Sequence, residues 1–407
     1  MSKEKRRVPK LRFPGFTEDW EQRKLSDIST KVTTKNVDVH YTETLTNSAE
    51  QGIISQVDFF DKEISNKDNI NGYYIVENND FIYNPRISTL APVGPINRNK
   101  LNRTGIMSPL YTVFRASTVD LDFLEWYFQS SHWHRYMKLN GDSGARADRI
   151  AIKDSTFFDM PIKTPVNIKE QVLIGETLEK FNQYVTLHQR KLEHLNLKKK
   201  ALLQKLFPKN GERYPELRFP GFTDAWEQRK FKDLFIERRE KTIRENEETL
   251  LSCAITGIYL NSELFSHFRG SSTIGYLKIK KYDLILSAQN LHLGNANINL
   301  SFDKGMISPA YKVFELKSID PYFINAWVKK DSTKNFFLKA TTEGASQCRK
   351  NIEWDVLLNQ EIPVPNKLEQ RTIGRFINNI DMIITLHQRK LEHLQLQKKA
   401  LLQQMFV

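Results

Sequence analysis

The sequence predicts an α+β fold in which two mixed α/β domains alternate with the two arms of a long antiparallel two-helix coiled coil. The phrase TLHQRKLEHL at 186–195 returns letter for letter at 385–394, and LRFPGFT followed by WEQRK opens at Leu11 and returns from Leu217. Each copy ends in an uninterrupted heptad pattern. One unit of about two hundred residues is therefore written twice, which predicts a tandem repeat with approximate two-fold symmetry.

The length and the repeat together set the expected domain boundaries. A chain of 407 residues exceeds the usual single domain. We expect a first mixed domain over 1–165, a spacer helix over 166–207, a second mixed domain over 208–365 and a second spacer helix over 366–407. Weaker matches occur in the same order in both halves of the chain. TLTNSAEQGI (44–53) is similar to TLLSCAITGI (249–258), and GIMSPLYTVF (105–114) is similar to GMISPAYKVF (305–314). Residues 54–104 hardly align with 259–304, so the copies share a frame and differ in what it carries.

Local patterns predict the elements of each mixed domain. The segments GYYIVENNDFIYN (72–84) and PLYTVFRAS (109–117) are rich in aromatic and β-branched residues bounded by Gly, Asn and Pro, which predicts strands. One helix is expected over 120–139 and another over 320–339, the second with Asp320 as its N-cap and Pro321 at its first position. Prolines in MPIKTPV and IPVPN then end the domains before the long helices.

The heptad pattern predicts how the long helices pack. From Ile174 and from Ile373 the seam positions recur at alternating spacings of four and three. The central seam residues are Val185, His188, Leu192 and Leu195 in the first copy and Ile384, His387, Leu391 and Leu394 in the second. Two similar seams pack most economically against each other, and the short linker at 208–216 makes the pair antiparallel. We interpret the histidines as polar residues that set the register, because a lone His per helix makes no metal site.

The composition favours a polyanionic partner. Lys and Arg number 61 against 48 Asp and Glu, giving a net charge of +13, which favours a partner such as nucleic acid. A merely basic soluble protein is the plain alternative. Cys253 and Cys348 form no C-x-x-C pair, so neither a zinc site nor a disulfide framework is indicated. A cytoplasmic location is expected, since no run of about 18 apolar residues occurs.

The ordered repeat resembles a known family. Two variable domains, each opened by LRFPGF and a following Trp and closed by an EQ pair that runs into a helix ending in KKALLQ, are similar to the specificity (S) subunit of type I restriction-modification enzymes. The resemblance covers the whole chain. It implies that each target recognition domain reads one half of a bipartite DNA site, and that the helices set the spacing and dock two methyltransferase (M) subunits. It also implies restriction (R) subunits as further partners, with S-adenosylmethionine, ATP and magnesium bound by the partner subunits and no cofactor on this chain.

The helix ends are the expected docking surface for the methyltransferase subunits. The ALLQ segments are nearly identical in the two copies, beyond what a coiled coil requires. Leu202 and Leu401 represent this surface.

Two loop regions per domain supply candidate DNA contacts, because Lys and Arg bind phosphates, Arg reads guanine, and Asn or Gln reads adenine. In the stretch 84–105 and its counterpart 287–300 the candidates are Arg86, Arg98, Lys100 and Arg103, and Gln289, Asn290, His292 and Asn295. The glycine-bearing loops at 141–149 and 342–350 add Arg146 and Arg149, and Gln347, Arg349 and Lys350. The first set is cationic and the second is rich in amides, so we expect the two halves to read different bases. Ordinary solvated loops, or loops packed on the long helix, are the structural alternatives.

Enzyme signatures are weak, and we expect no catalytic residues and no metal site. YNPR (83–86) lacks the second proline of an adenine methyltransferase motif, and GSSTIGYL (270–277) lacks the Lys and Ser/Thr of a phosphate-binding loop. Asp283 with ELK (315–317) matches only a short, common nuclease pattern. Two rival hypotheses stay open at this point: a self-sufficient DNA nuclease or methyltransferase with diverged motifs, and a coiled-coil interaction protein unrelated to nucleic acid.

Overall fold

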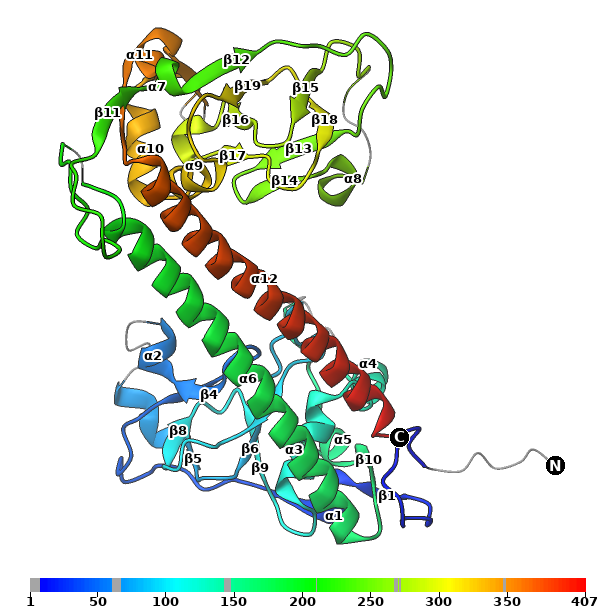
Figure 1. Ribbon diagram of the computed structural model, residues 1–407. Helices are drawn as coiled ribbons and strands as arrows, with labels where there is room; N and C mark the ends of the chain where they lie inside the picture. The colour runs from blue at the N-terminus through cyan, green and yellow to red at the C-terminus, as the bar shows by residue number, and fades with distance from the viewer. Residues whose placement is uncertain are drawn as a thin grey trace. The chain divides into compact units, whose positions relative to one another are not determined.

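The computed structural model describes residues 8–60, 67–142, 148–209, 211–266, 270, 272–346 and 349–407, which fall into two units (Figure 1). Unit 1 comprises Met1–His188 with Lys390–Val407, and unit 2 comprises Gln189–Arg389. Each unit therefore contains one mixed α/β domain and parts of both long helices, α6 (Ile168–Lys205) and α12 (Lys367–Gln404). None of the described helices is both long enough and apolar enough to cross a bilayer.

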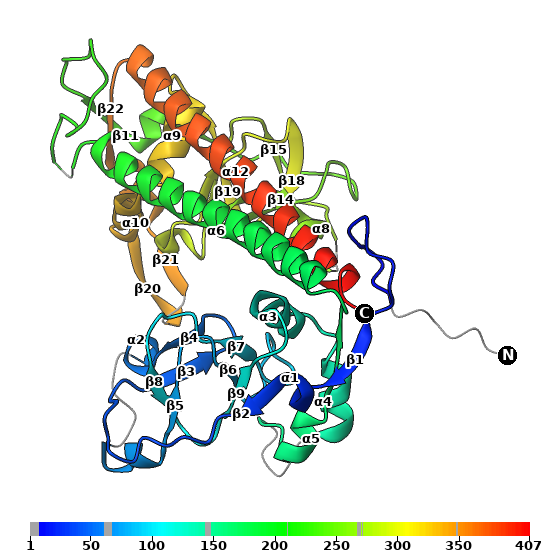
Figure 2. The same cartoon turned by 90° about the horizontal axis from the view of Figure 1, so that it is seen from below.

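Unit 1 is built on a four-stranded antiparallel sheet with smaller strand pairs around it (Figure 2). The sheet order is β2 (Ser29–Lys31), β9 (Thr112–Ala116), β6 (Phe81–Tyr83) and β7 (Ile96–Arg98). The pairs are β1 (Glu21–Lys24) with β10 (Pro161–Thr164), β3 (Leu45–Ser48) with β4 (Gly52–Ser55), and β5 (Tyr74–Val76) with β8 (Gly105–Met107). The helices before α6 are α1 (Leu25–Ile28), α2 (Gln56–Phe60), η1 (Lys67–Gly72), α3 (Leu121–Gln129), α4 (His134–Asn140) and α5 (Asp154–Phe158).

Unit 2 repeats this arrangement. Its four-stranded sheet has the order β12 (Phe235–Arg238), β19 (Tyr311–Leu316), β16 (Leu284–Ser287) and β17 (Ala296–Ile298). The pairs are β11 (Glu227–Lys230) with β22 (Glu361–Val364), β13 (Leu251–Ala254) with β14 (Gly257–Leu260), β15 (Leu277–Lys280) with β18 (Lys304–Ile307), and β20 (Thr341–Ser346) with β21 (Arg349–Ile352). Its helices before α12 are α7 (Phe231–Leu234), α8 (Asn261–Leu264), η2 (Leu291–Leu293), α9 (Pro321–Val328), α10 (Asp331–Leu338) and α11 (Trp354–Asn359). The predicted fold class is confirmed in both units. The central strands of the two units correspond even where the sequences of the two copies do not align.

The match between residues 44–53 and residues 249–258 is shifted by one position in the structure. Leu45 lies against Gly105 as Leu251 lies against Gly305, so Leu45 is equivalent to Leu251 rather than to Leu250. The cause is the hairpin turn, because β3 and β4 close at Ser48 and Gly52 whereas β13 and β14 close at Ala254 and Gly257, one residue sooner. Upstream of the turn, the decapeptides that align by sequence are therefore out of register by one residue.

The expected helix over 120–139 is two shorter helices, α3 and α4. The Asp120 side chain caps α3 by accepting from the backbone N–H of Phe123, and the backbone N–H of Ser130 closes its end. In unit 2 the corresponding break separates α9 from α10, while the predicted Asp320 cap and Pro321 at the first position are confirmed. In unit 1 the break lets Trp133 fold back, so that its indole N–H donates to the Phe128 carbonyl oxygen at 3.0 Å.

A buried ion pair attaches the start of each long helix to its domain. Glu170 is 1% exposed and accepts from Arg12 Nε at 2.7 Å and from Trp20 Nε1 at 3.3 Å. In unit 2 Glu369 is 0% exposed and accepts from Arg218 Nε at 2.8 Å. These contacts explain why the LRFPGF phrase and the EQ pair occur together in both copies.

The neighbouring glutamine and a glycine complete the same junction. The side-chain oxygen Oε1 of Gln171 accepts from the backbone N–H of Asp120 at 3.0 Å, and Oε1 of Gln370 accepts from the backbone N–H of Asp320 at 2.9 Å. One turn further on, a Cβ at Gly175 would lie 2.8 Å from the backbone nitrogen of Phe123. Gly175 is therefore required by the close approach of α6 to the start of α3. Gly374 has the same role in unit 2, where an added Cβ would lie 2.6 Å from the backbone nitrogen of Phe323.

Parts of α6 and α12 pack antiparallel within each unit. In unit 1, Lys398 Nζ donates to Asn182 Oδ1 at 2.7 Å, and Met405 lies in the same core as Ile174 and Leu178. In unit 2, Lys199 Nζ lies 2.5 Å from Asp381 Oδ1, and Leu206 shares a core with Ile373 and Ile377. Of the predicted central seam residues, Val185, Leu192, Leu391 and Leu394 are buried, and His188, Leu195, Ile384 and His387 are partly buried.

The ends of the long helices enter the domain cores. The Phe406 ring lies 6.4 Å from the ring of Trp20 and 5.4 Å from the ring of Phe123 in unit 1. The Phe207 ring lies 5.8 Å from Trp226 and 5.2 Å from Phe323 in unit 2. The sequence therefore repeats at its helix ends because each end completes an aromatic core.

Replacing the buried carboxylate tests this junction. Glu170→Gln leaves the largely buried Arg12 without its counter-charge, so we expect unit 1 to lose about 3 kcal/mol of stability. Urea-dependent hydrogen exchange resolved by peptide measures the two units separately, and unit 2 serves as the internal control. Glu369→Gln should produce the reverse pattern, and the pair Arg12→Met with Glu170→Met should recover part of the loss. Unchanged exchange in unit 1 after Glu170→Gln would contradict the assignment.

Candidate nucleic-acid interface

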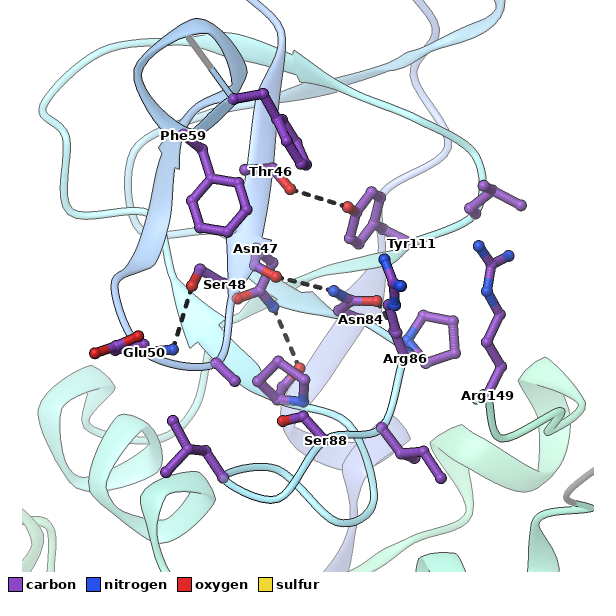
Figure 3. A pocket seen from close by; sticks show the side chains of 17 residues that line it. Thr46, Asn47, Ser48, Glu50, Phe59, Asn84, Arg86, Ser88, Tyr111 and Arg149 are labelled. Atoms are coloured by element: carbon purple, nitrogen blue, oxygen red, sulfur yellow. Dashed lines mark hydrogen bonds between the residues drawn. The ribbon is translucent and has the colours of Figure 1, made fainter. Parts of the chain in front are cut away.

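A cavity of about 330 Å³ opens in unit 1 beside the strand pair β3–β4 and the loop that follows β6 (Figure 3). Its walls include Phe59 and Phe60 at the end of α2, Tyr111 directly before β9, and the two cations Arg86 and Arg149. Figure 3 shows Phe59 across the cavity from the two arginine side chains. The cavity thus combines aromatic walls with a cationic edge.

Backbone pairing brings the two arginines together. Arg86 and Arg149 face each other in an antiparallel bridge, flanked by hydrogen bonds from Ile87 N to Asp148 O and from Ile150 N to Pro85 O, both 2.9 Å. Neither guanidinium forms an ion pair with a residue in the described part of the chain. The sequence placed these arginines in separate loops, and the structure joins them in one cationic site.

Unit 2 has a corresponding cavity of about 410 Å³. Gln289 and Asn290 line it, together with Phe265 and Tyr311. Gln289 is exposed and Asn290 is half-buried. Two of the amide-bearing side chains predicted for this unit therefore lie where unit 1 carries a cationic edge.

The strand register makes Arg86 and Gln289 equivalent. Phe81 pairs with Phe114 in unit 1, and Leu284 pairs with Phe314 in unit 2. Arg86 and Gln289 lie the same number of residues beyond Phe81 and Leu284. One position at the cavity edge is therefore an arginine in one unit and a glutamine in the other.

Two aromatic wall residues recur in both cavities and were missed by the sequence analysis. Tyr111 and Tyr311 follow the repeated Ser-Pro turn, and each tyrosine N–H donates to the carbonyl oxygen of Ser108 or Ser308 at 3.1 Å. The tyrosine hydroxyls bond to the neighbouring hairpins, Tyr111 to Thr46 Oγ1 at 3.1 Å and Tyr311 to the Cys253 carbonyl at 3.0 Å. The matching phrases GIMSPLYTVF and GMISPAYKVF were the available signal. Phe60 and Phe265 also follow the repeated glycines of β4 and β14 by the same number of residues in the sequence.

Polar side chains behind each cavity differ between the units. In unit 1, Asn97 Nδ2 donates to Asn47 Oδ1 at 2.6 Å, and Gln129 Nε2 donates to Asn97 Oδ1 at 2.9 Å. The side chains of Asn47, Asn97 and Gln129 are all neutral amides. They tie β3 to β7 and α3.

In unit 2 the corresponding residues are Cys253, Asn297 and Lys329. Asn297 Nδ2 donates to Cys253 Sγ at 2.9 Å, while Lys329 Nζ donates to Asn297 Oδ1 and, at 2.8 Å, to the Ile255 carbonyl oxygen. Burial lowers the pKa of Lys329 to about 8 and raises the pKa of Cys253 to about 11. A titratable ammonium thus occupies the position of Gln129.

Two predicted DNA contacts are buried in structural interactions. Arg98 is 9% exposed, and its guanidinium forms ion pairs with Asp122 and Glu125. Asn295 is 5% exposed and accepts from Cys253 Sγ at 3.3 Å. These placements contradict a direct role in DNA contact, because both side chains already satisfy groups inside the domain.

Lys100, Arg103, His292 and Lys350 do not line either cavity. Lys100 Nζ lies 3.4 Å from both Glu125 and Glu179, and Arg103 forms a bidentate pair with Glu43 at 2.7 and 2.8 Å. His292 is in η2 and Lys350 is in β21, both partly exposed. Arg349 has a described backbone in β21, whereas Arg146 and Gln347 lie outside the described residues.

The carboxylate pattern of the nuclease hypothesis has a structural explanation. Asp283 accepts from the backbone N–H of Lys280 at 2.7 Å and from Arg238 Nε at 3.0 Å, and Glu315 pairs with the same arginine at 3.0 Å. In unit 1, Asp80 accepts from the backbone N–H of Glu77 at 2.7 Å and pairs with Arg115. This aspartate therefore closes a turn in both units. No group of three or more His, Cys, Asp and Glu side chains in the described ranges is arranged to hold a metal ion.

The buried lysine gives unit 2 a specific pH dependence. Because the pKa of Lys329 falls from 10.5 to about 8, burial opposes the charged form, and this destabilisation is fully present below pH 8. It is relieved as the pH rises from about 8 to 10.5, since the unfolded chain then binds more protons than the folded one. Lys329→Gln should therefore change the stability of unit 2 relative to wild type by an amount that varies between pH 7.5 and 10.5.

Thermal unfolding across this pH range, monitored by hydrogen exchange in unit 2, measures the stability difference between wild type and Lys329→Gln. The nearby charged and titratable groups are Cys253, Lys199 and Asp381, and they are unchanged in the variant. Gln129→Lys is the reciprocal variant and should introduce a similar dependence into unit 1. A constant difference between wild type and Lys329→Gln at every pH would contradict the lowered pKa.

Comparisons with known proteins agree with this architecture. Residues 223–396 match the family described as type I restriction modification DNA specificity domain. The type I restriction enzyme MjaVIII specificity subunit of Methanocaldococcus jannaschii is 23% identical over 321 residues, which cover 74% of this chain and 73% of that protein.

Two solved structures share the fold over nearly the whole chain. The type I restriction-modification S subunit from M. genitalium aligns with a TM-score of 0.59 at 12% identity, covering 98% of this chain and 99% of that one. A chain from a structure on complex assembly and conformational transition of the type I R-M system aligns with a TM-score of 0.52 at 13% identity, with coverages of 98% and 99%. Residues 223–396 therefore carry a type I restriction modification DNA specificity domain, and the first half of the chain repeats the sequence phrases and the fold of that matched half.

Proposed function

We propose that the two units are target recognition domains that each read one half of a bipartite site in double-stranded DNA. The observation that carries the proposal is the recurrence of one cavity at the same strand register with Arg86 in unit 1 and Gln289 in unit 2. A common frame with a different reading side chain is what two different half-sites require.

The two side chains suit different bases. Arginine donates two parallel hydrogen bonds to guanine O6 and N7, whereas glutamine can both donate to and accept from adenine. Arg149 lies beside Arg86 and suits a backbone phosphate, which fixes the register of the protein on the duplex. The net charge of +13 adds a sequence-independent attraction to DNA.

The remaining parts of the proposal concern the assembly. We propose that this chain is a non-catalytic subunit of a multisubunit methyltransferase and endonuclease complex in the cytoplasm. The antiparallel helices act as a coiled-coil spacer between half-sites and dock two methyltransferase (M) subunits, to which restriction (R) subunits are added. S-adenosylmethionine, ATP and magnesium are bound by those partner subunits.

We propose a docking surface other than the one expected at Leu202 and Leu401. Leu202 packs against the core of unit 2 and Leu401 packs against the core of unit 1, so their burial has a structural cause. Better candidates are Leu187 and Leu197, which are 62% and 68% exposed, and their repeats Leu386 and Leu396, both 67% exposed. Repetition of exposed leucines in both helices favours a partner that binds once per repeat.

Exchanging the reading residues tests the recognition proposal. Arg86→Gln places the unit 2 residue in unit 1 and should change one half of the methylated sequence, with discrimination at one base pair altered by about 1–3 kcal/mol. The methylation pattern in cells that contain the complete system, and binding to duplexes with single base changes, provide the measurement. Gln289→Arg should change only the other half. A change in both halves, or in neither, would contradict the assignment.

Charged substitutions on the exposed leucines test docking. Leu187→Asp with Leu386→Asp should abolish co-purification of the methyltransferase subunit, because a charge replaces an apolar contact in each repeat. Their exposure limits the effect on folding to about 0.5 kcal/mol. Leu202→Asp is the matched contrast, since it should destabilise unit 2 itself. Retained co-purification with the double variant would place the docking surface elsewhere.

A further inference from the structure

Unit 1 exposes two adjacent aromatic side chains at the edge of its cavity. Phe59 is 40% exposed and Phe60 is 39% exposed, and their ring centroids lie 4.7 Å apart in an edge-to-face arrangement. Both residues line the cavity that contains Arg86 and Arg149. Exposed aromatic pairs are unfavourable in water, so this one points to a ligand with an aromatic or apolar surface.

The surroundings of the pair favour a nucleobase as that ligand. Leu90 and Leu110, which are 70% and 61% exposed, extend the apolar edge of the same cavity, and Figure 3 places Phe59 across it from both arginines. A guanidinium with no ion-pair partner in the described part of the chain can contact a phosphate, while a phenyl ring can stack on the face of a base. DNA presents both surfaces within one nucleotide.

The two units differ at this edge. Asn261 N bonds to Leu250 O as Gln56 N bonds to Thr44 O, which makes Leu264 equivalent to Phe59 and Phe265 equivalent to Phe60. Ala310 of the second Ser-Pro turn stands where unit 1 has Leu110. Among the residues that the structure describes, the aromatic pair and the larger apolar edge therefore occur in unit 1.

We infer that Phe59 and Phe60 form an apolar wedge that stacks on a base of the first half-site and unstacks one base step there. Apolar side chains inserted at a base step deform the duplex, and the cost of deformation depends on sequence. The wedge therefore adds recognition at a step that Arg86 does not read. This inference rests on the proposed function, because it requires unit 1 to hold DNA.

Site-specific fluorescence tests the wedge. The chain is assembled with its methyltransferase partner and bound to duplexes that carry 2-aminopurine at successive positions of the first half-site. The methylated adenine is left unlabelled, because methyltransferases themselves flip their target base. Wild-type protein should raise the fluorescence severalfold at one base step. Phe59→Leu with Phe60→Ala should abolish that rise and weaken specific binding by about tenfold.

Matched variants separate the wedge from other causes. Phe59→Leu alone installs the unit 2 residue, preserves an apolar side chain, and should still reduce the signal. Phe59→Tyr keeps the aromatic surface and should retain it, and Leu264→Ala in unit 2 should leave the first half-site unaffected. Circular dichroism and co-purification of the methyltransferase subunit confirm that each variant is folded and assembled.

Two results would overturn the wedge. No fluorescence rise at any step with wild-type protein, combined with wild-type affinity of the double variant, refutes it while half-site recognition by Arg86 stands. Loss of co-purification in the double variant assigns the phenylalanines to a protein contact instead. If Arg86→Gln also leaves the first half-site unchanged, the proposed function of unit 1 fails together with the wedge.

Discussion

A buried carboxylate at the start of each long helix holds the recognition domain and the helix together. Glu170 and Glu369 are almost inaccessible to water, and each accepts two hydrogen bonds from one arginine, Arg12 or Arg218. An unpaired buried carboxylate would be strongly destabilising, so the helix start and the arginine-bearing segment must occur together. The adjacent glutamine bonds to the residue that caps α3 or α9, which connects the same junction to the domain core.

This junction fixes the frame while leaving the cavity edge free to vary. The glutamates, glutamines and glycines of the junction lie far along the chain from the loop that follows β6 or β16. The strand pairs keep the same order in both units although residues 54–104 and 259–304 barely align. Backbone hydrogen bonds and a pattern of buried apolar residues suffice to specify these strands, so the exposed loop side chains are available for recognition.

Three equivalent positions at or near the cavities differ between the two units. Arg86 is replaced by Gln289, Gln129 by Lys329, and Phe59 by Leu264. Each exchange alters charge, titration or aromatic surface without changing the strand order. A repeated scaffold with different side chains at equivalent positions is physically suited to contact two different DNA sequences.

The sequence by itself determined the tandem repeat, the long helices and the fold class, because heptad periodicity, repeated phrases and the Asp320-Pro321 start are local signals. It also selected Arg86, Arg149, Gln289 and Asn290 as candidate DNA contacts, and these four residues line the two cavities. Composition cannot distinguish an exposed arginine from a buried one, so only the tertiary structure showed that Arg98 pairs with Asp122 and Glu125 inside unit 1. Only the fold brought Arg86 beside Arg149, because their bridge depends on long-range backbone pairing that leaves no periodic trace in the sequence.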